Sequence, residues 1–244
     1  MKFEGRDIKM VWIDLDDTII DFETNSRRAL HRLWEEEPDV HSVFATANGW
    51  IDIYEYHNHK LWAQYGAGEI SRSYLRMERF IRPLTAGGVP LPRARILAER
   101  FDTLYLDYLA MERALIPGSM ELLKFFKEHG VKVGCLSNGF KDVQFRKIRN
   151  CGLEPWFDIV VLSDDIGVNK PAPEIFRYAE RRSGISTPEA HLMIGDNPES
   201  DIAGALGAGW GAIRFLRHPG TPEAPGCKRA VDTLNDIPAM LVWE

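Results

Sequence analysis

Cysteine is scarce in this sequence, and long apolar runs and an excess of basic residues are both absent. The three cysteines among 244 residues exclude a disulfide framework and fit a reducing compartment, so we expect a cytoplasmic protein. No apolar run approaches the ~20 residues of a membrane span, and segment 1–7 lacks the apolar centre of a signal peptide. Acidic residues outnumber basic ones by 36 to 30, which argues against a nucleic-acid polymer as partner.

Apolar segments instead alternate regularly with segments of helical periodicity. The apolar segments, which we expect to be strands, are 8–15, 131–136, 158–162, 191–194 and 211–216. The helical segments between them are 120–128, 141–150, 174–182 and 199–206. A strand of nearly continuous apolar residues is typical of a parallel sheet buried on both faces. The order therefore predicts an α/β fold with a doubly wound parallel sheet.

The region 22–112 differs, because it carries helical periodicity and no convincing strand. Its expected helices are 25–37, 48–65, 71–81 and 92–111, with Pro83 and the turn 86–90 separating the last two. We therefore expect an α/β domain formed by 1–21 and 113–244, interrupted by an all-helical domain at 22–112. A loop at 219–226 should precede a short C-terminal strand and helix.

Polar residues follow each predicted strand at its carboxyl end. In an open α/β sheet, ligands bind beyond these ends, at the point where the chain reverses direction across the sheet. The residues are Asp14, Asp16, Asp17 and Thr18 after the first strand, Ser137 and Asn138 after the second, Lys170 after the third, and Asp196 and Asp201 after the fourth. Each segment alone is more often an ordinary turn, but their joint occurrence predicts one acidic pocket with a lysine and a hydroxyl.

This set suits phosphoryl transfer to a carboxylate nucleophile. A carboxylate that approaches a phosphate meets a repulsion of about 4 kcal/mol per charge pair at ~4 Å and an effective dielectric of ~20. Mg²⁺ held by Asp14 and Asp196, together with Lys170, would cancel that repulsion. A second carboxylate can protonate the leaving alkoxide and then deprotonate water, and Ser137 with the following N–H groups can hold phosphate oxygens.

The four segments, taken in order, resemble the motifs of the haloacid dehalogenase superfamily. They are Asp14-Leu15-Asp16-Asp17-Thr18, Leu136-Ser137-Asn138-Gly139, Lys170-Pro171-Ala172-Pro173, and the segment from Gly195 to Asp201. The resemblance implies a nucleophile at Asp14, and at Asp16 a general acid/base whose backbone carbonyl binds Mg²⁺. It further implies a second carboxylate ligand at Asp196, support from Thr18 and Asp201, phosphate binding by Ser137, Asn138 and Lys170, and a cap domain at 22–112 that selects the substrate.

Within this superfamily, Asp16 favours a phosphatase, because members that cleave carbon–halogen or carbon–phosphorus bonds lack the second aspartate. Segments 20–26, 137–152 and 163–170 resemble more narrowly the branch of pyrimidine 5′-nucleotidases. We therefore expect a monomer or dimer that acts on a small-molecule phosphate ester, with nucleoside 5′-monophosphates favoured. A broad small-metabolite or sugar phosphatase, a sugar phosphomutase and a non-catalytic phosphate-binding module are the alternatives.

Other features have mainly structural interpretations. His57 and His59 stand two residues apart on a helix and cannot share a face. Glycines 204, 207 and 209 end a helix, whereas a dinucleotide fingerprint follows a strand. Three arginines at helical spacing, Arg72, Arg76 and Arg79, suggest a solvated stripe paired with Glu69 and Glu78, or else a group that reaches substrate. Most aromatic residues of the insertion should form its core; they are Trp34, Phe44, Trp50, Tyr54, Tyr56, Trp62, Tyr65 and Tyr74.

Overall fold

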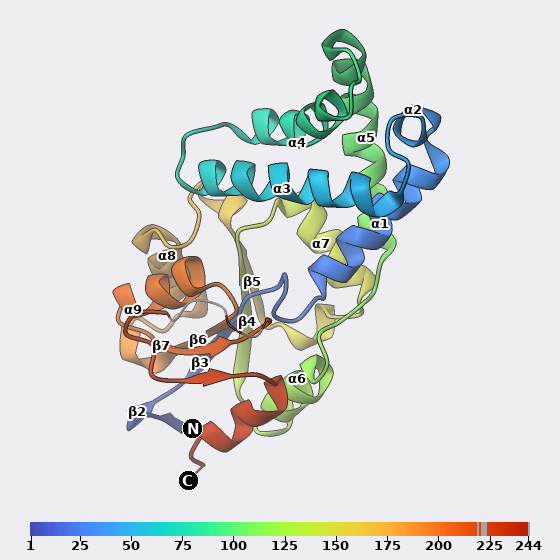
Figure 1. Cartoon of the computed structure of the whole chain (residues 1–244). Helices are drawn as coiled ribbons and strands as arrows, with labels where there is room; N and C mark the ends of the chain where they lie inside the picture. The colour runs from blue at the N-terminus through green and yellow to red at the C-terminus, as the bar shows by residue number, and fades with distance from the viewer. Residues whose placement is uncertain (219, 221–223, 244) are drawn as a thin grey trace. The chain divides into compact units, whose positions relative to one another are not determined.

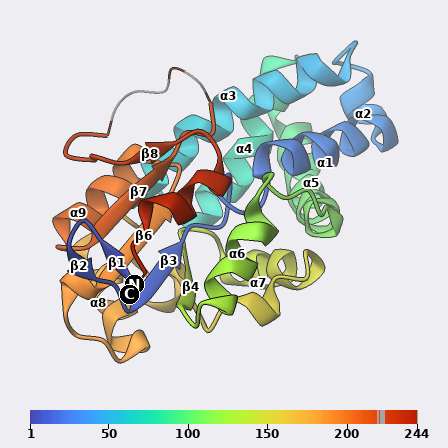
Figure 2. The ribbon, with the colours of Figure 1, turned by 90° about the horizontal axis from the view of Figure 1, so that it is seen from below.

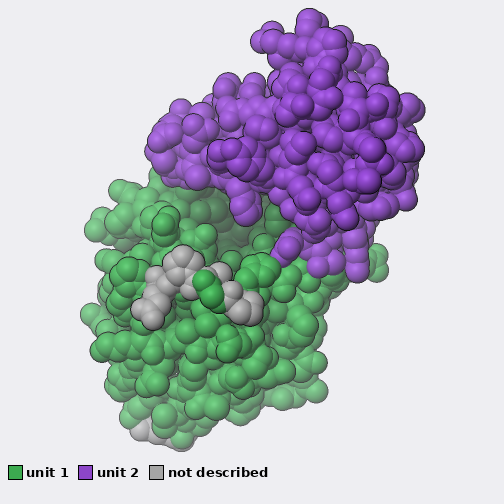
Figure 3. All heavy atoms as spheres, in the orientation of Figure 1, with its two compact units in different colours: residues 1–22, 113–244 green, residues 23–112 purple. Residues whose placement is uncertain are grey.

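The computed structural model describes residues 1–218, 220 and 224–243, and it divides the chain into two compact units (Figure 3). Unit 1 comprises Met1–Phe22 and Arg113–Glu244, and unit 2 comprises Glu23–Glu112. Phe22, which we expected in the insertion, belongs to unit 1. Among the described residues, none of the helices has the length and apolar character that crossing a membrane requires.

Unit 1 is built on a six-stranded sheet in which every neighbouring pair of strands is parallel (Figure 1). The strands, in spatial order, are β5 (Ile159–Leu162), β4 (Lys132–Ser137), β3 (Met10–Ile13), β6 (His191–Gly195), β7 (Gly211–Phe215) and β8 (Ala230–Val231). The chain adds β4 and β5 on one side of β3 and β6 to β8 on the other. This reversal makes the carboxyl end of β3 the switch point of the sheet, and it confirms the predicted doubly wound fold.

Helices cover both faces of this sheet (Figure 2). The longer helices of unit 1 are α6 (Ser119–Glu128), α7 (Lys141–Asn150) and α8 (Pro173–Ser183), and the shorter ones are α9 (Gly204–Gly207) and the 3₁₀ helices η1 (Glu154–Trp156), η2 (Ser163–Asp165), η3 (Pro188–Ala190) and η5 (Leu234–Met240). Alternate side chains of β3 face the two layers, as the pleat requires. Val11 and Ile13 pack in the core with α6, α7 and η5, whereas Met10 and Trp12 pack with α8 and α9.

The expected helix 199–206 is instead a π-helix, η4 (Pro198–Ala203), followed by the short α9. The Asn197 side chain accepts hydrogen bonds from the N–H groups of Glu199 and Ser200, so the first turn is fixed by the cap. The carbonyl of Asn197 then accepts from both Asp201 and Ile202, which widens the turn. The widened turn brings the Asp201 carboxylate back to the Asn197 N–H, at 3.1 Å.

Two segments near the ends of the chain depart from the sequence analysis or lie partly outside the described residues. A short hairpin of β1 (Lys2–Phe3) and β2 (Arg6–Asp7) was not predicted; its turn residues Glu4 and Gly5 have φ of 47° and 78°. Of the expected loop 219–226, residues 219 and 221–223 lie outside the described part of the chain. The strand and helix expected after it are β8 and the 3₁₀ helix η5.

Unit 2 consists of helices joined by short connections. Its helices are α1 (Phe22–Glu36, which begins on the last residue of unit 1), α2 (Pro38–His41), α3 (Ala47–Gly66), α4 (Arg72–Ala86) and α5 (Leu91–Met111). Thr46 and Ser71 cap α3 and α4 through their hydroxyl oxygens. The core is aromatic: the rings of Tyr54 and Phe80 lie 5.2 Å apart and those of Phe80 and Tyr105 5.8 Å apart. Of the eight aromatic residues expected to supply most of it, however, only Phe44, Trp50 and Tyr54 are buried.

The prediction that Pro83 ends its helix is wrong, because α4 continues to Ala86. Proline removes one hydrogen bond to the preceding turn but leaves its own carbonyl free to accept. The N–H of Gly87 donates to that carbonyl at 2.9 Å, so the last turn closes after the proline. The turn at 86–90 alone separates α4 from α5.

The expected arginine stripe of α4 is also corrected by the structure. Arg76 and Arg79 both bind the carboxylate of Asp102 on α5, and Arg79 is only 3% exposed. Glu78, the partner that we expected, pairs instead with Arg82. Sequence spacing placed the arginines on one face of α4, but the opposite charge lies on another helix 23 residues beyond Arg79.

Candidate active site

The predicted site residues meet at the carboxyl edge of the sheet, where β3, β4 and β6 end side by side. Ile13 is in register with Cys135 of β4 and with Ile194 of β6. Asp14 therefore comes directly after the central strand, and its N–H donates to the carbonyl of Ile194 at 2.9 Å. Segments more than a hundred residues apart in sequence are brought to one edge by parallel pairing.

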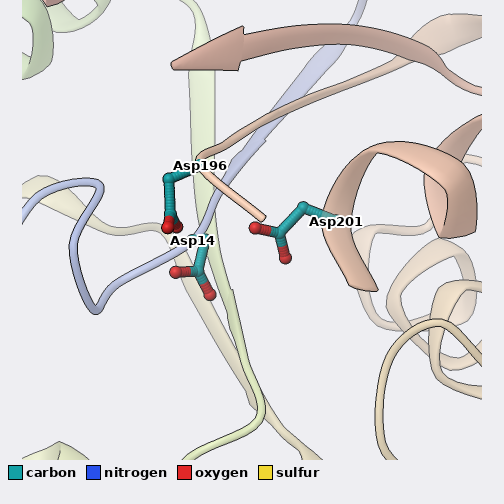
Figure 4. A group of neighbouring side chains, drawn as sticks. All are labelled: Asp14, Asp196 and Asp201. Atoms are coloured by element: carbon teal, nitrogen blue, oxygen red, sulfur yellow. The ribbon is translucent and has the colours of Figure 1, made fainter. Parts of the chain in front are cut away.

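Three carboxylates converge at this edge, those of Asp14, Asp196 and Asp201 (Figure 4). One oxygen of each lies within 4.8 Å of the others. Asp14 and Asp196 follow strand ends, while Asp201 comes from η4. Gly195 permits the approach of Asp201, because a Cβ at that position would lie 2.4 Å from the Asp201 Oδ2 atom.

Lys170 joins two of these acids from the buried side. Its Nζ atom lies 2.6 Å from Asp14 Oδ1 and 2.6 Å from Asp201 Oδ1, and it donates to the carbonyl of Leu136 at 2.6 Å. The lysine is 2% exposed. Burial alone lowers its pKa, but the charges of Asp14 and Asp201 and their hydrogen bonds outweigh that effect, so the pKa is raised and Lys170 stays charged.

Asn138 holds the backbone of Lys170 in place. The Asn138 amide nitrogen donates to the Lys170 carbonyl at 2.9 Å, and the Lys170 N–H donates to the Asn138 amide oxygen at 2.7 Å. Both ends of the amide are thus bonded to the backbone that carries the lysine. Phosphate binding by Asn138 stays a prediction.

The acids carry more negative charge than Lys170 neutralises. Burial, together with the charges of Asp201 and Asp16, raises the pKa of Asp14 to about 7 against the lowering effect of Lys170. Burial likewise raises the pKa of Asp196 well above its usual value, with added repulsion from Asp201, Asp14 and Asp17. The part of each pKa shift that comes from neighbouring acids is repulsion that a bound cation would offset.

Thr18 supports Asp196 in two ways. The Thr18 hydroxyl donates to Asp196 Oδ1 at 3.1 Å and accepts from the Asp196 N–H at 3.1 Å. Thr18 has no exposed surface, so its hydroxyl is held at the strand end by packing. The structure thus brings Thr18 into contact with Asp196, and its supporting role in the reaction stays a prediction.

Asp16 lies apart from the three converging carboxylates, with its side chain 29% exposed. Its Oδ2 atom accepts from Gln144 Nε2 at 2.8 Å, and its Oδ1 atom is paired with Lys147 Nζ. Gln144 also donates to the hydroxyl of Ser137 at 2.7 Å. The sequence analysis named Asp16 and Ser137 but missed the two residues of α7 that contact them.

A signal for these two residues exists in the sequence of α7. Its buried positions are Val143, Gln144, Lys147 and Ile148, which repeat at the spacing of one helix face. Two of the four are polar and long, and one is a lysine, which is almost never fully buried unless it is paired. A polar pair on the inward face of an amphipathic helix is the pattern that could have revealed them.

The donor set fits a hard divalent cation such as Mg²⁺. Carboxylate oxygens are the ligands that Mg²⁺ prefers. The pKa values of Asp14 and Asp196 are raised first by burial and then by repulsion from the neighbouring acids, and a bound cation would offset that repulsion. The converging carboxylates are those of Asp14, Asp196 and Asp201. The carboxylate of Asp16 is bonded elsewhere, so its expected part as a ligand rests on its backbone carbonyl and stays a prediction.

The chain belongs to the haloacid dehalogenase-like hydrolase family, whose family model matches residues 8–209. It is an enzyme of that family, and the resemblance seen in the sequence is confirmed. The Escherichia coli pyrimidine 5′-nucleotidase YjjG is 29% identical over 237 residues, covering 96% of this chain and 99% of that protein. The phosphoserine phosphatase of Thermus thermophilus is 32% identical over 240 residues, covering 89% and 93%.

The fold is shared with solved structures of the family. The structure of the HAD-hydrolase YfnB from Bacillus subtilis, in a magnesium-bound form, superimposes with a TM-score of 0.85 at 24% identity, covering 96% of this chain and 99% of that one. The defluorinating L-2-haloacid dehalogenase Rha0230 superimposes with a TM-score of 0.78 at 18% identity. Enzymes with different chemistries thus share this fold, and the side chains of the site must decide between them.

Proposed function

We propose that this enzyme is a Mg²⁺-dependent phosphomonoesterase that works through a phosphoaspartate intermediate. The observation that carries the proposal is the placement of two aspartates, Asp14 and Asp16, in different environments. Asp14 is buried against Lys170 and the other acids, whereas Asp16 is partly exposed and bonded to α7. Two carboxylates with separate surroundings suit separate parts as nucleophile and as proton carrier.

The proposed reaction has two steps. In the first, Asp16 enters in its protonated form: a carboxylate oxygen of Asp14 forms a bond to phosphorus, the bond from phosphorus to the ester oxygen breaks, and the Asp16 proton passes to the leaving oxygen, so that Asp16 becomes a carboxylate. In the second, water attacks the phosphorus of the phosphoaspartate, Asp16 takes a proton from that water, and inorganic phosphate leaves. Lys170 and Ser137 would hold the phosphoryl oxygens, with Asn138 keeping the Lys170 backbone in place.

The proposed metal ligands are the carboxylates of Asp14 and Asp196 and the backbone carbonyl of Asp16, with Asp201 in support. When bound, Mg²⁺ would neutralise the acids and favour the approach of an anionic phosphate ester. The support for the metal is the surplus of negative charge at the site, which Lys170 only partly offsets.

Unit 2 is proposed to be the cap domain that selects the substrate, with residues 1–21 and 113–244 as the catalytic domain. Nucleoside 5′-monophosphates are the substrates favoured, which the relatives YjjG and PynA, both pyrimidine 5′-nucleotidases, support. Among the aromatic residues of the unit, Trp50 and Tyr54 are core residues, but Tyr56 and Tyr74 are 58% and 45% exposed. An exposed ring could stack on a nucleobase for ~1–3 kcal/mol.

A small-metabolite phosphatase is the second candidate. The phosphoserine phosphatase of Thermus thermophilus is more identical to this chain, at 32%, than YjjG, at 29%. Phosphoserine has no base to stack, so an enzyme for it would gain nothing from exposed rings in unit 2. The two candidates share the proposed chemistry and differ only in the substrate.

A phosphate-release assay with and without Mg²⁺ tests both candidates. Its panel should include dUMP, dTMP, phosphoserine, hexose phosphates and a hexose 1-phosphate. Release from the nucleotides supports the nucleotidase, release mainly from phosphoserine supports the second candidate, and isomerisation of the hexose 1-phosphate without release would indicate a phosphomutase. No release from any ester in Mg²⁺ would refute the proposed function.

A further inference from the structure

The residues Gln144 and Lys147 of α7 form a buried polar pair at the edge of the site. Lys147 is 3% exposed and Gln144 is 1% exposed. They stand three residues apart, so their side chains share one face of the helix. Each contacts a different oxygen of the Asp16 carboxylate, Gln144 at Oδ2 and Lys147 at Oδ1.

Burial of the Lys147 ammonium requires compensation from its surroundings. Removing a charge from water costs several kcal/mol unless a partner of opposite charge replaces the water. Asp16 is that partner. In addition, the centroid of the Phe22 ring lies 5.0 Å from Lys147 Nζ, a distance that permits a cation–π interaction. The lysine can therefore reach its buried position only with its charge directed at Asp16.

Gln144 ties Asp16 to the second segment of the site. Its Nε2 atom donates both to Asp16 Oδ2 and to the hydroxyl of Ser137, at 2.8 and 2.7 Å. Gly139 makes room for it, because a Cβ there would lie 2.2 Å from the Gln144 amide. The absence of a side chain at Gly139 thus leaves the space that Gln144 occupies beside Asp16.

We propose that Lys147 and Gln144 are positioning residues that hold the Asp16 carboxylate in the orientation needed for proton transfer to and from the ester oxygen. The proposal rests on the phosphomonoesterase function argued above. A carboxylate held at both oxygens has lost its rotational freedom before substrate arrives, and preorganisation of this kind favours the transition state. Neither residue needs to touch the substrate for this role.

The way in which the loss of kcat depends on the leaving group separates a positioning role of Lys147 and Gln144 from a merely structural one. An alkyl ester such as dUMP needs a proton on its leaving oxygen, whereas p-nitrophenyl phosphate has a leaving group that hardly needs one. In Lys147→Met and in Gln144→Leu we expect kcat for dUMP to fall ~10- to 100-fold, part of the ~10²–10⁴ that a general acid contributes. The kcat for p-nitrophenyl phosphate should fall by less than about threefold in the same variants.

The ratio of the two rates is measured on one sample, so partial unfolding of a variant lowers both rates and leaves the ratio unchanged.

A double-mutant cycle adds a second readout. In the Asp16→Asn background, Lys147→Met should cause little further loss on dUMP, because no proton carrier is left to position. Lys141→Met is the matched control: this lysine is on the same helix but pairs with Asp165, at 2.9 Å, and the ratio should not change.

Equal losses on both esters in Lys147→Met and Gln144→Leu would overturn the proposal, as would full additivity with Asp16→Asn. The wild-type enzyme, assayed beside the variants, shows whether a failure concerns the phosphomonoesterase function or only the positioning role of Lys147 and Gln144. If the wild type hydrolyses neither these two esters nor any other ester of the panel in Mg²⁺, the phosphomonoesterase function itself fails; if it prefers another alkyl ester of the panel, that ester takes the place of dUMP in the comparison. If it hydrolyses both and the variants keep the wild-type ratio, only the positioning role fails.

Discussion

Each unit of the molecule buries a cluster of opposite charges, and the two clusters are balanced in opposite ways. In unit 2, two guanidinium groups, those of Arg76 and Arg79, share the single carboxylate of Asp102. In unit 1, two carboxylates, those of Asp14 and Asp201, share the single ammonium of Lys170, and Asp196 lies beside them. Both clusters contain side chains that are only a few per cent exposed.

The two clusters differ in how burial and neighbouring charges shift the pKa values of their members. The acidic cluster of unit 1 raises the pKa of Asp14 to about 7 and that of Asp196 well above its usual value, so it has capacity for a further cation. The arginine cluster of unit 2 keeps Arg79 charged: burial lowers its pKa, but Tyr54 and Asp102 raise it by more. We therefore interpret the first cluster as a binding site and the second as part of the helical core.

The largest expected effect is on activity, in Asp14→Asn. The amide has the shape of the carboxylate but is not a nucleophile toward phosphorus, so phosphate release should disappear almost wholly. Thermal unfolding without metal should occur at the same or a higher temperature than in the wild type, because one of the surplus buried charges is removed. More than about a tenth of the wild-type rate in this variant would contradict the aspartyl mechanism.

The next largest effect should be on stability, in Asp102→Asn. This change leaves two arginines, one of them fully buried, without a balancing carboxylate, and breaking a buried pair costs ~3–5 kcal/mol. Chemical denaturation would measure it as a lower free energy of unfolding. Asp39→Asn is the control, because Asp39 pairs with Arg93 on the surface and should cost no more than ~1 kcal/mol. Similar small losses in both variants would remove the structural role given to the cluster.

Removal of the metal at different pH values tests whether the acidic cluster of unit 1 binds a cation. Without metal, folded Asp14 and Asp196 hold protons at pH values where the unfolded chain has lost them, so the free energy of unfolding falls as pH rises from about 4 through about 7. Bound Mg²⁺ would compete with those protons for the carboxylates. At a hundred times its Kd, a ligand of the folded state raises the free energy of unfolding by ~2.7 kcal/mol. At a fixed Mg²⁺ concentration, this increase should be larger at pH 8 than at pH 5.5. The difference in Tm between Mg²⁺ and EDTA, measured at both pH values, checks this. An equal difference at both would show that these acids are not the ligands.

The smallest effect concerns the substrate. We expect kcat/KM for dUMP or dTMP to be at least about ten times that for hexose phosphates, a difference of ~1.4 kcal/mol. Replacing the exposed rings of Tyr56 and Tyr74 by leucine, one at a time, asks whether unit 2 supplies that preference; Tyr178 of unit 1, changed in the same way, is the control. If hexose phosphates are hydrolysed as well as the nucleotides, the nucleotidase proposal fails while the phosphatase proposal stands.

Much of the site could be predicted because it is local to the strand ends. Asp14 follows a buried strand directly, and Asp196 follows another, so their meeting needs only that the two strands be parallel and adjacent. Asp201 was expected only in support, yet its carboxylate converges with the other two. Its approach depends on the wide turn of η4, which propensities for ordinary α-helix do not predict.

Side-chain contacts between different helices and strands could not be predicted from the hydrophobic periodicity of the sequence. The sequence analysis placed Arg79 on a helix face but not opposite Asp102, and it placed Lys147 on α7 without its partner Asp16. The interpretation of Asn138 as a phosphate ligand did not anticipate the two bonds of its amide to the Lys170 backbone. A hydrogen bond between distant segments depends on the packing of whole elements, which no short window of sequence contains.

The amino-acid sequence by itself determined the class of fold, the helical insertion and the identity of the acids and lysine at the strand ends. These follow from hydrophobic period and strand order, which are properties of single segments and their succession. Only the tertiary structure decided which polar groups face one another. At the sheet edge, one lysine contacts two of the three converging carboxylates; in the helical unit, two arginines contact one aspartate; and a buried lysine and glutamine contact Asp16. Side-chain pairing depends on distances of a few ångströms between elements far apart in the chain, and those distances exist only once the elements have packed.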